Sequence, residues 1–125
     1  GYGDSLELDG VINLGWLPES KMPLLYNSAD AYLHTSDYEG FGLPILEAMS
    51  CGTPTIANDR ASIPEVIGPD NTINMNSIPT SKICDHIFEK IEMGMDQLAL
   101  DRSNQFTWDK TASDTLNVYR AVLGA

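Results

Sequence analysis

Short apolar segments alternate with helix-like segments along most of this chain. The predicted strands are four, at residues 11–14, 31–34, 54–57 and 72–75. The predicted helices lie at residues 18–28, 44–50, 63–67, 80–93 and 96–103, and a last one begins near residue 108. Strands that alternate with helices favour a parallel sheet with helices on its faces, and right-handed crossovers then connect the strands. The sequence therefore predicts an α/β fold.

Capping residues indicate where several of these helices begin and end. Ser62 followed by Glu65 fits a capping box, in which each side chain satisfies a backbone N–H of the other residue. Gly68 is predicted to end that short helix, and Gly52 to end the helix over 44–50. Thr107 is the predicted N-cap of the last helix.

The composition is that of an ordinary globular domain. The chain has 125 residues, of which 42% are hydrophobic and 20% charged, and one domain is expected at this length. No stretch approaches the ~20 apolar residues of a membrane-spanning helix. A formal net charge of −11, from 18 acidic and 7 basic residues, disfavours nucleic-acid binding, which depends on basic patches. It also leaves few cations for an anionic ligand.

The cysteines and histidines do not have the spacing of metal ligands. Cys51 and Cys84 form no Cys-x-x-Cys arrangement, and we interpret both as small buried hydrophobes in a reducing compartment. His34 and His86 form no cluster of ligands. The sequence therefore predicts no metal site.

The segment 37–47 carries the most chemical information in the chain. It places two carboxylates, Glu39 and Glu47, eight positions apart. Pro44 is favoured in the first turn of a helix, which predicts Glu39 on a loop and Glu47 in the first or second helical turn. Gly40 and Gly42 allow a tight turn and a close approach of a ligand. Free N–H groups at a helix start bind phosphate or sugar oxygens, so this arrangement suits a nucleotide sugar.

Each of these residues also has a simpler interpretation. Glu47 alone could stabilise the helix dipole, which is worth roughly 0.3–1 kcal/mol, and Glu39 alone could be a solvated loop carboxylate. Phe41 could fill the core. The combination favours a ligand site, because the loop follows the apolar strand predicted at 31–34 and ligands bind at the carboxyl ends of strands in open α/β sheets.

The chain resembles the carboxy-terminal half of the retaining GT-B glycosyltransferases of group 1, also called family 4. Five segments match in order, at residues 13–18, 24–30, 36–54, 63–67 and 106–108. The third contains the signature E-x7-E, formed by Glu39 and Glu47. The resemblance covers nearly the whole chain and implies a Rossmann-like parallel sheet flanked by helices, as a partial C-terminal domain of such an enzyme.

The resemblance implies a role for each site residue. Glu39 would lie beside the transferred sugar as the catalytic residue, and Glu47 would hydrogen-bond the ribose hydroxyls of the nucleotide. The other donor-binding residues would be Gly40, Phe41, Gly42 and Leu43, through their backbone N–H groups, with Trp16 and Leu17 near the base. The family needs no metal for transfer, and no other cofactor is expected beyond the donor substrate.

The resemblance also implies what lies outside residues 1–125. We expect these residues to be the nucleotide-sugar-binding domain without its first strands and without the N-terminal acceptor domain. The family's basic pair for the diphosphate is absent, and Arg60 and Lys21 are the nearest candidates. The donor would be a UDP-, GDP- or ADP-sugar, and the acceptor a sugar, lipid or protein. The protein is expected in the cytoplasm, with any membrane association residing mostly in the N-terminal domain. This piece alone is expected to transfer no sugar.

Three alternatives remain open from the sequence. The chain could be a non-catalytic nucleotide-binding module, or part of a sugar-nucleotide epimerase of similar fold. A dehydrogenase-type dinucleotide domain is disfavoured, because Gly40-Phe41-Gly42 lacks the third glycine of Gly-x-Gly-x-x-Gly.

Overall fold

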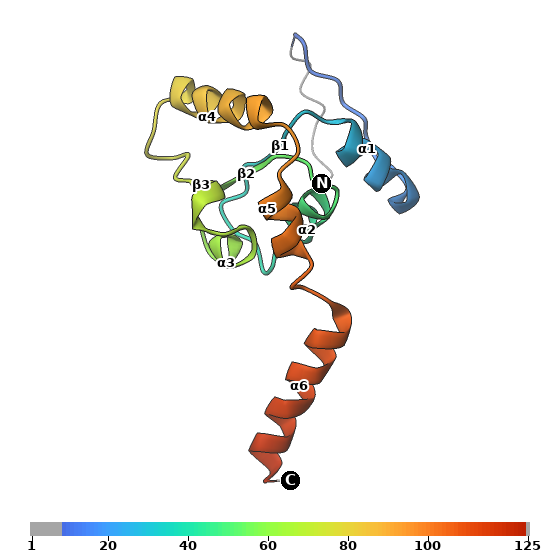
Figure 1. Ribbon diagram of the computed structural model, residues 1–125. Coiled ribbons are helices and arrows are strands. Elements are labelled where there is room, and N and C mark those ends of the chain that lie inside the picture. Colours follow the sequence, from blue (N-terminus) through green and yellow to red (C-terminus); the bar gives the residue numbers. More distant parts are fainter. Residues whose placement is uncertain (1–8, 125) are drawn as a thin grey trace.

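The structure is a computed structural model, and it describes residues 9–124 (Figure 1). Three strands are present: β1 (Tyr32–His34), β2 (Thr55–Asn58) and β3 (Thr72–Ile73). The helices are α1 (Met22–Ser28), α2 (Leu43–Ser50), α3 (Ile63–Ile67), α4 (Thr80–Met93), α5 (Gln97–Ser103) and α6 (Trp108–Leu123). Two 3-10 turns, η1 (Glu19–Lys21) and η2 (Pro69–Asn71), precede α1 and β3.

The strands form one parallel sheet in the order β1-β2-β3. β2 is central, and all four of its residues are buried. The helix α4 covers one face of this sheet, while α2, α3 and α5 gather on the other face (Figure 1). This arrangement confirms the predicted α/β fold with a parallel sheet between helices.

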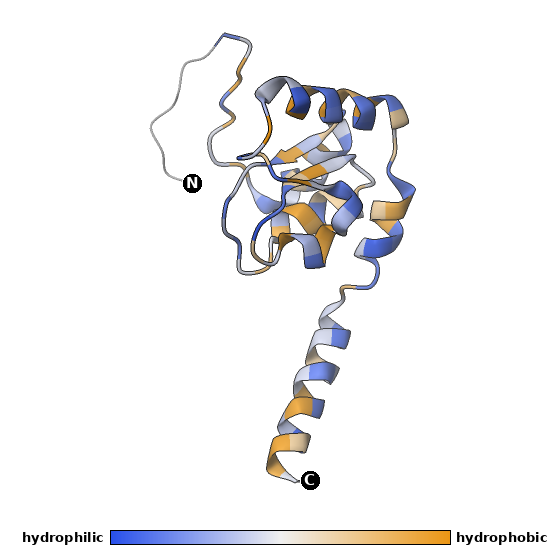
Figure 2. Ribbon diagram, turned by 90° about the vertical axis from the view of Figure 1, so that its left-hand side faces the viewer, coloured by the Kyte–Doolittle hydropathy of each residue, from blue (hydrophilic) through white to orange (hydrophobic). Residues whose placement is uncertain are grey.

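The core lies on the side of the sheet that carries α2, α3 and α5. Its buried cluster combines side chains from these helices and from β2 (Ile45, Met49, Ala57, Ile63, Val66, Ile67 and Ala99). Figure 2 shows hydrophobic residues concentrated in the sheet and in the helices beneath it. Ile45 and Met49 place α2 in this core. The helix α2, which follows the Glu39 loop, therefore cannot shift without disturbing the core.

The last helix, α6, projects away from the α/β body, and every residue of it is exposed (Figure 1). Its N-cap is as predicted, because the Thr107 side chain accepts a hydrogen bond from the backbone N–H of Lys110. No helix of residues 9–124 combines the length and the apolar character that a membrane span requires.

The predicted strand at residues 11–14 does not form. Its side chains are exposed, Ile12 to 84%, and the described sheet contains no strand other than β1, β2 and β3. Without a neighbouring strand, nothing completes the ladder of hydrogen bonds. The Asn13 side chain instead accepts a hydrogen bond from the N–H of Gly15, at 2.9 Å, in a local turn. The described sheet therefore has three strands rather than four.

Two further predictions about single residues are wrong. Ser62 makes no side-chain capping bond at the start of α3, since its hydroxyl donates instead to the carbonyl oxygen of Glu39. The cysteines are not buried: Cys84 is exposed and Cys51 only half-buried. A long-range contact replaces the local cap in the first case.

Candidate functional site

The loop between β1 and α2 leaves the sheet at the carboxyl end of β1, and the neighbouring elements fix its backbone. Asp37 accepts hydrogen bonds from the side-chain amides of Asn58, at the end of β2, and Asn76, both at 2.8 Å. The Ser62 hydroxyl donates to the Glu39 carbonyl oxygen at 2.8 Å. Glu39 is therefore held by the strand end beside it and by the start of α3.

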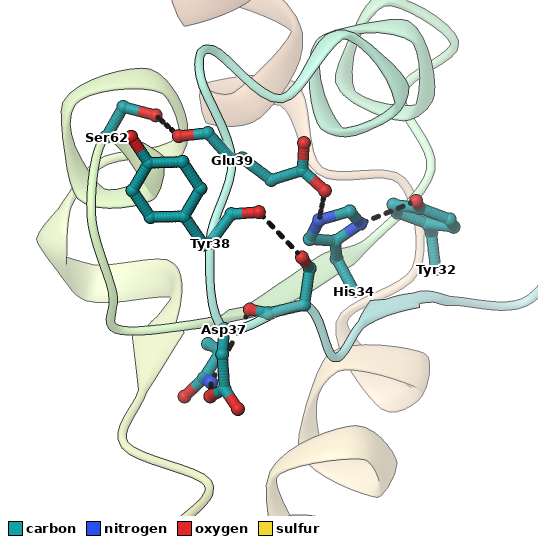
Figure 3. Close-up of polar contacts among 8 residues, drawn as sticks. Tyr32, His34, Asp37, Tyr38, Glu39 and Ser62 are labelled. Carbon is teal, nitrogen blue, oxygen red and sulfur yellow. Dashed lines mark hydrogen bonds and ion pairs between the residues drawn. The ribbon is translucent and has the colours of Figure 1, made fainter. Parts of the chain in front are cut away.

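The side chain of Glu39 points back toward β1 (Figure 3). Its Oε1 lies 3.1 Å from Nε2 of His34, and Nδ1 of His34 lies 2.9 Å from the hydroxyl of Tyr32. His34 is buried, whereas the Glu39 side chain keeps 31% of its surface exposed. One carboxylate oxygen is thus tied to the protein while part of the group faces solvent.

Glu47 lies in the second turn of α2, as predicted, and is held from another element. The hydroxyl of Tyr26, on α1, donates to its Oε2 at 3.0 Å. Tyr26 itself is buried. That burial is the main cause, and the hydrogen bond to Glu47 the second, that raises the pKa of the Tyr26 hydroxyl well above its ordinary value. The phenol therefore remains a hydrogen-bond donor to Glu47 throughout the physiological range.

Tyr32 connects the surroundings of the two acids. Its ring packs edge-on against the ring of Tyr26, with centroids 5.5 Å apart. Burial, and next the charges of Glu39 and Glu47, raise the pKa of the Tyr32 hydroxyl to about 12. Tyr32 contacts Tyr26 and His34, the residues that contact Glu47 and Glu39, so both acids lie beside the same aromatic cluster. The separate roles predicted for them stay predictions.

In the glycine turn between the two acids, several backbone N–H groups have no hydrogen-bond acceptor within the described residues. Gly42 has a φ of +93° and forms the N-cap of α2, where its carbonyl accepts from the N–H groups of Ile45 and Leu46. Within residues 9–124 no acceptor lies in hydrogen-bonding range of the N–H groups of Gly40, Phe41, Gly42 or Leu43. These groups sit at the positive end of the α2 dipole, where anionic oxygens bind.

The Phe41 side chain of the same turn makes an aromatic contact and lines an apolar groove. Phe41 packs edge-on against Phe106, with ring centroids 5.7 Å apart. An apolar groove of about 580 Å³ runs along this contact, lined by Phe41, Leu43, Leu46, Phe106, Thr107, Trp108 and Thr111. The interpretation of Phe41 as a core plug is wrong, since it remains 41% exposed. Its ring anchors the turn while its N–H stays free.

Trp16 and Leu17 precede α1 on an irregular segment. Trp16 is 84% exposed, and Leu17 is half-buried. Their predicted place near a nucleotide base stays a prediction.

Cations near the site are scarce. Arg60 lies in the loop from β2 to α3, two residues before Ser62; it is exposed, and no acid of residues 9–124 forms an ion pair with it. Arg102 is committed to the carbonyl oxygens of Glu65 and Val66. Arg60 therefore has no ion-pair partner within residues 9–124, and its role as a candidate cation for the diphosphate stays a prediction.

Sequence reasoning missed Tyr26 and His34, which contact the acids, and Tyr32, which contacts His34. The signal for two of them was present, because side chains two positions apart point to the same face of a strand. Tyr32 and His34 meet this condition in β1. The contact from Tyr26 crosses from α1 to α2 and has no local signature in the sequence.

These features describe an α/β domain whose parallel sheet presents an acidic loop and an open helix N-terminus at one edge. The glycosyl transferases group 1 family matches residues 4–92. Because this match covers well over half of the chain, the chain belongs to that family of transferases. The resemblance found in the sequence is therefore confirmed at the level of the family.

Three relatives of similar sequence are mannosyltransferases by name. The chain is 37% identical to O-antigen chain mannosyltransferase B of Escherichia coli, over 86% of this chain and 29% of the relative. It is 31% identical to serotype-specific mannosyltransferase WbdA of Escherichia coli, over 98% of this chain and 15% of the relative. It is 30% identical to MMP alpha-(1->4)-mannosyltransferase of Mycolicibacterium hassiacum, over 86% of this chain and 28% of the relative. The chain thus spans less than a third of each. No solved structure gives a significant match.

Proposed function

We propose that this chain is the donor-binding half of a retaining glycosyltransferase, which moves a sugar from a nucleotide sugar to an acceptor. One observation carries the proposal. Four successive backbone N–H groups, from Gly40 to Leu43, have no acceptor within residues 9–124 and are flanked by Glu39 and Glu47. Donors for phosphate oxygens and acceptors for hydroxyls are the two kinds of group that a nucleotide sugar requires.

Each part of the site then has a chemical task. Glu47 accepts hydrogen bonds from the ribose hydroxyls, and Tyr26 keeps that carboxylate in place. Glu39 accepts from hydroxyls of the transferred sugar and stabilises the positive charge that develops at its anomeric carbon. The open N–H groups and the α2 dipole stabilise the leaving diphosphate, which is electrostatic catalysis by preorganised donors. This scheme uses no metal and no cofactor.

The names of the relatives indicate which sugar the donor could carry. Three of them are mannosyltransferases, so we propose a nucleotide-activated mannose as the first donor to test, in a protein of the cytoplasm. The acceptor, whether sugar, lipid or protein, would be bound by a second domain. Since transfer needs the cleft between two domains, we expect residues 1–125 alone to show no turnover.

The test is substitution of each acid in the full-length protein. Glu47→Gln keeps the size of the side chain but removes its charge, and it should weaken donor binding by roughly 1.5–3 kcal/mol, the scale of a charged hydrogen bond. Glu39→Gln should lower kcat more than it changes donor affinity. Calorimetry measures the first effect and steady-state kinetics the second.

A matched control is available on the other face of the sheet. Glu92, on α4, is exposed, and Glu92→Gln should change neither quantity. Donor affinity that is unaltered in Glu47→Gln would contradict the ribose role. A Glu39→Gln protein with normal kcat and a raised KM would contradict the catalytic role.

A further inference from the structure

We propose that His34 is a positioning residue for Glu39: its Nε2–H group, set by a hydrogen bond from Tyr32, fixes one carboxylate oxygen and leaves the other for the donor. The inference rests on the proposed function, because it assigns a partner to the acid that would meet the transferred sugar. It concerns residues of β1, which lie below the loop rather than in it.

The hydrogen on His34 follows from the chemistry of its neighbours. A carboxylate has acceptors only, so the 3.1 Å contact between Nε2 and Glu39 Oε1 requires a hydrogen on Nε2. The other ring nitrogen, Nδ1, lies 2.9 Å from the Tyr32 hydroxyl. In the neutral ring that nitrogen is an acceptor, and the phenol supplies the hydrogen that it needs.

Tyr32 is well suited to remain the donor. Its hydroxyl stays protonated because burial and the two nearby carboxylates raise its pKa to about 12. The ring is half-buried and packs against Tyr26. Figure 3 shows the contacts that join Tyr32, His34 and Glu39. With the hydrogen of the neutral ring on Nε2, donation runs in one direction, from the phenol through the imidazole to the carboxylate.

The consequence is a Glu39 that is oriented before a ligand arrives. Its backbone is held by Ser62 and its Oε1 by His34. Its Oε2 has no hydrogen-bond donor within residues 9–124, and the side chain is partly exposed. A carboxylate fixed in this way loses less conformational freedom when it binds a hydroxyl, so preorganisation favours the reaction.

The kinetic test uses the full-length protein, the nucleotide-activated mannose donor and three variants of His34. His34→Ala should lower kcat roughly ten- to hundredfold, since a misplaced catalytic group has effects of this order, while donor KM changes less. His34→Gln carries its amide nitrogen near the position of Nε2 and should recover most of the turnover. His34→Asn, whose amide lies near Nδ1, should not recover it.

The comparison of Gln with Asn separates positioning from simple loss of packing. Both variants place an amide in the same buried position, so equal melting temperatures with unequal kcat support the proposal. Equal kcat in the two variants would overturn it, as would a His34→Ala protein that turns over at the wild-type rate. Failure of the wild-type protein to bind any nucleotide sugar would instead contradict the proposed function.

The tautomer has its own readout, which does not depend on donor or activity. ¹⁵N NMR of the full-length protein with labelled histidine should show that the neutral form of the His34 ring carries its hydrogen on Nε2. Tyr32→Phe removes the phenolic donor and should reduce that population. A neutral ring that carries its hydrogen on Nδ1 in the wild-type protein would overturn the assignment.

Discussion

At the scale of residues, the two acids of the site are held by different chemistry. Glu47 receives a hydrogen bond from the buried phenol of Tyr26, and Glu39 contacts the buried imidazole of His34. Removing one member of a buried polar pair costs more than the bond itself, because the other member loses its partner away from water. Substitution of Tyr26 or His34 is therefore expected to leave its acid without that contact.

Tyr32 of this cluster makes the free energy of unfolding depend on pH in the alkaline range. The pKa of the Tyr32 hydroxyl is about 12 in the folded chain, against about 10 in an unfolded chain. Below pH 10 the group is protonated in both states and contributes no pH dependence. Above it, the unfolded state releases its proton first, so the free energy of unfolding falls as pH rises from about 10 to 12.

Urea denaturation of the 125-residue chain at a series of alkaline pH values measures this slope. Tyr32→Phe cannot release a proton, so it should make the slope shallower. The exposed Tyr119 is the matched control, and Tyr119→Phe should leave the slope unchanged. A slope that is the same in Tyr32→Phe as in the wild type would contradict the prediction.

At the scale of elements, the start of α2 depends on one glycine. Gly42 has a left-handed φ of +93°, and a Cβ at this position would lie 3.0 Å from Cδ1 of the buried Ile45. The backbone must turn here so that the helix can begin directly after the loop.

Gly42→Ala should therefore destabilise the chain by about 1–3 kcal/mol, from the left-handed conformation and the contact with Ile45 together. Thermal or chemical denaturation measures the change. Gly40→Ala is the matched control, because a Cβ at Gly40 meets nothing within 4 Å and its φ is not in the left-handed region. Equal stability of the two variants would show that the turn does not need its glycine at 42.

At the scale of the whole molecule, the chain divides into a packed α/β body and a helix that leaves it. The core cluster draws on α2, α3, α5 and β2, whereas α6 contributes no buried residue. Only its beginning, through Trp108 and Thr111, reaches the groove beside Phe41. Most of α6 therefore adds nothing to the packing of the body.

Removal of residues 112–125 from this chain should change the free energy of unfolding of the body by no more than about 0.5 kcal/mol, as for exposed positions in general. The midpoint of urea denaturation followed by far-ultraviolet circular dichroism measures it. A longer truncation that also removes α5 should unfold the body, since Ala99 belongs to the core. A marked loss of stability in the shorter truncation would show that α6 packs against the body in solution.

Local patterns determined much of this protein in advance. The alternation of strand and helix, a helix start at or beside Pro44, the cap at Thr107 and the Glu39–Glu47 spacing were all predictable from the sequence, because each depends on residues close together in the chain. The family followed from the same segments. Its match, over residues 4–92, confirms that interpretation.

Only the tertiary structure decided how the site is held. Ser62 looked like a helix cap, but its hydroxyl reaches Glu39, and the Tyr26 hydroxyl reaches Glu47 from another helix. The segment 11–14 has the composition of a strand, but no strand within residues 9–124 pairs with it. Hydrogen bonds between residues distant in the chain depend on where the fold brings their partners, and a linear pattern does not contain that information.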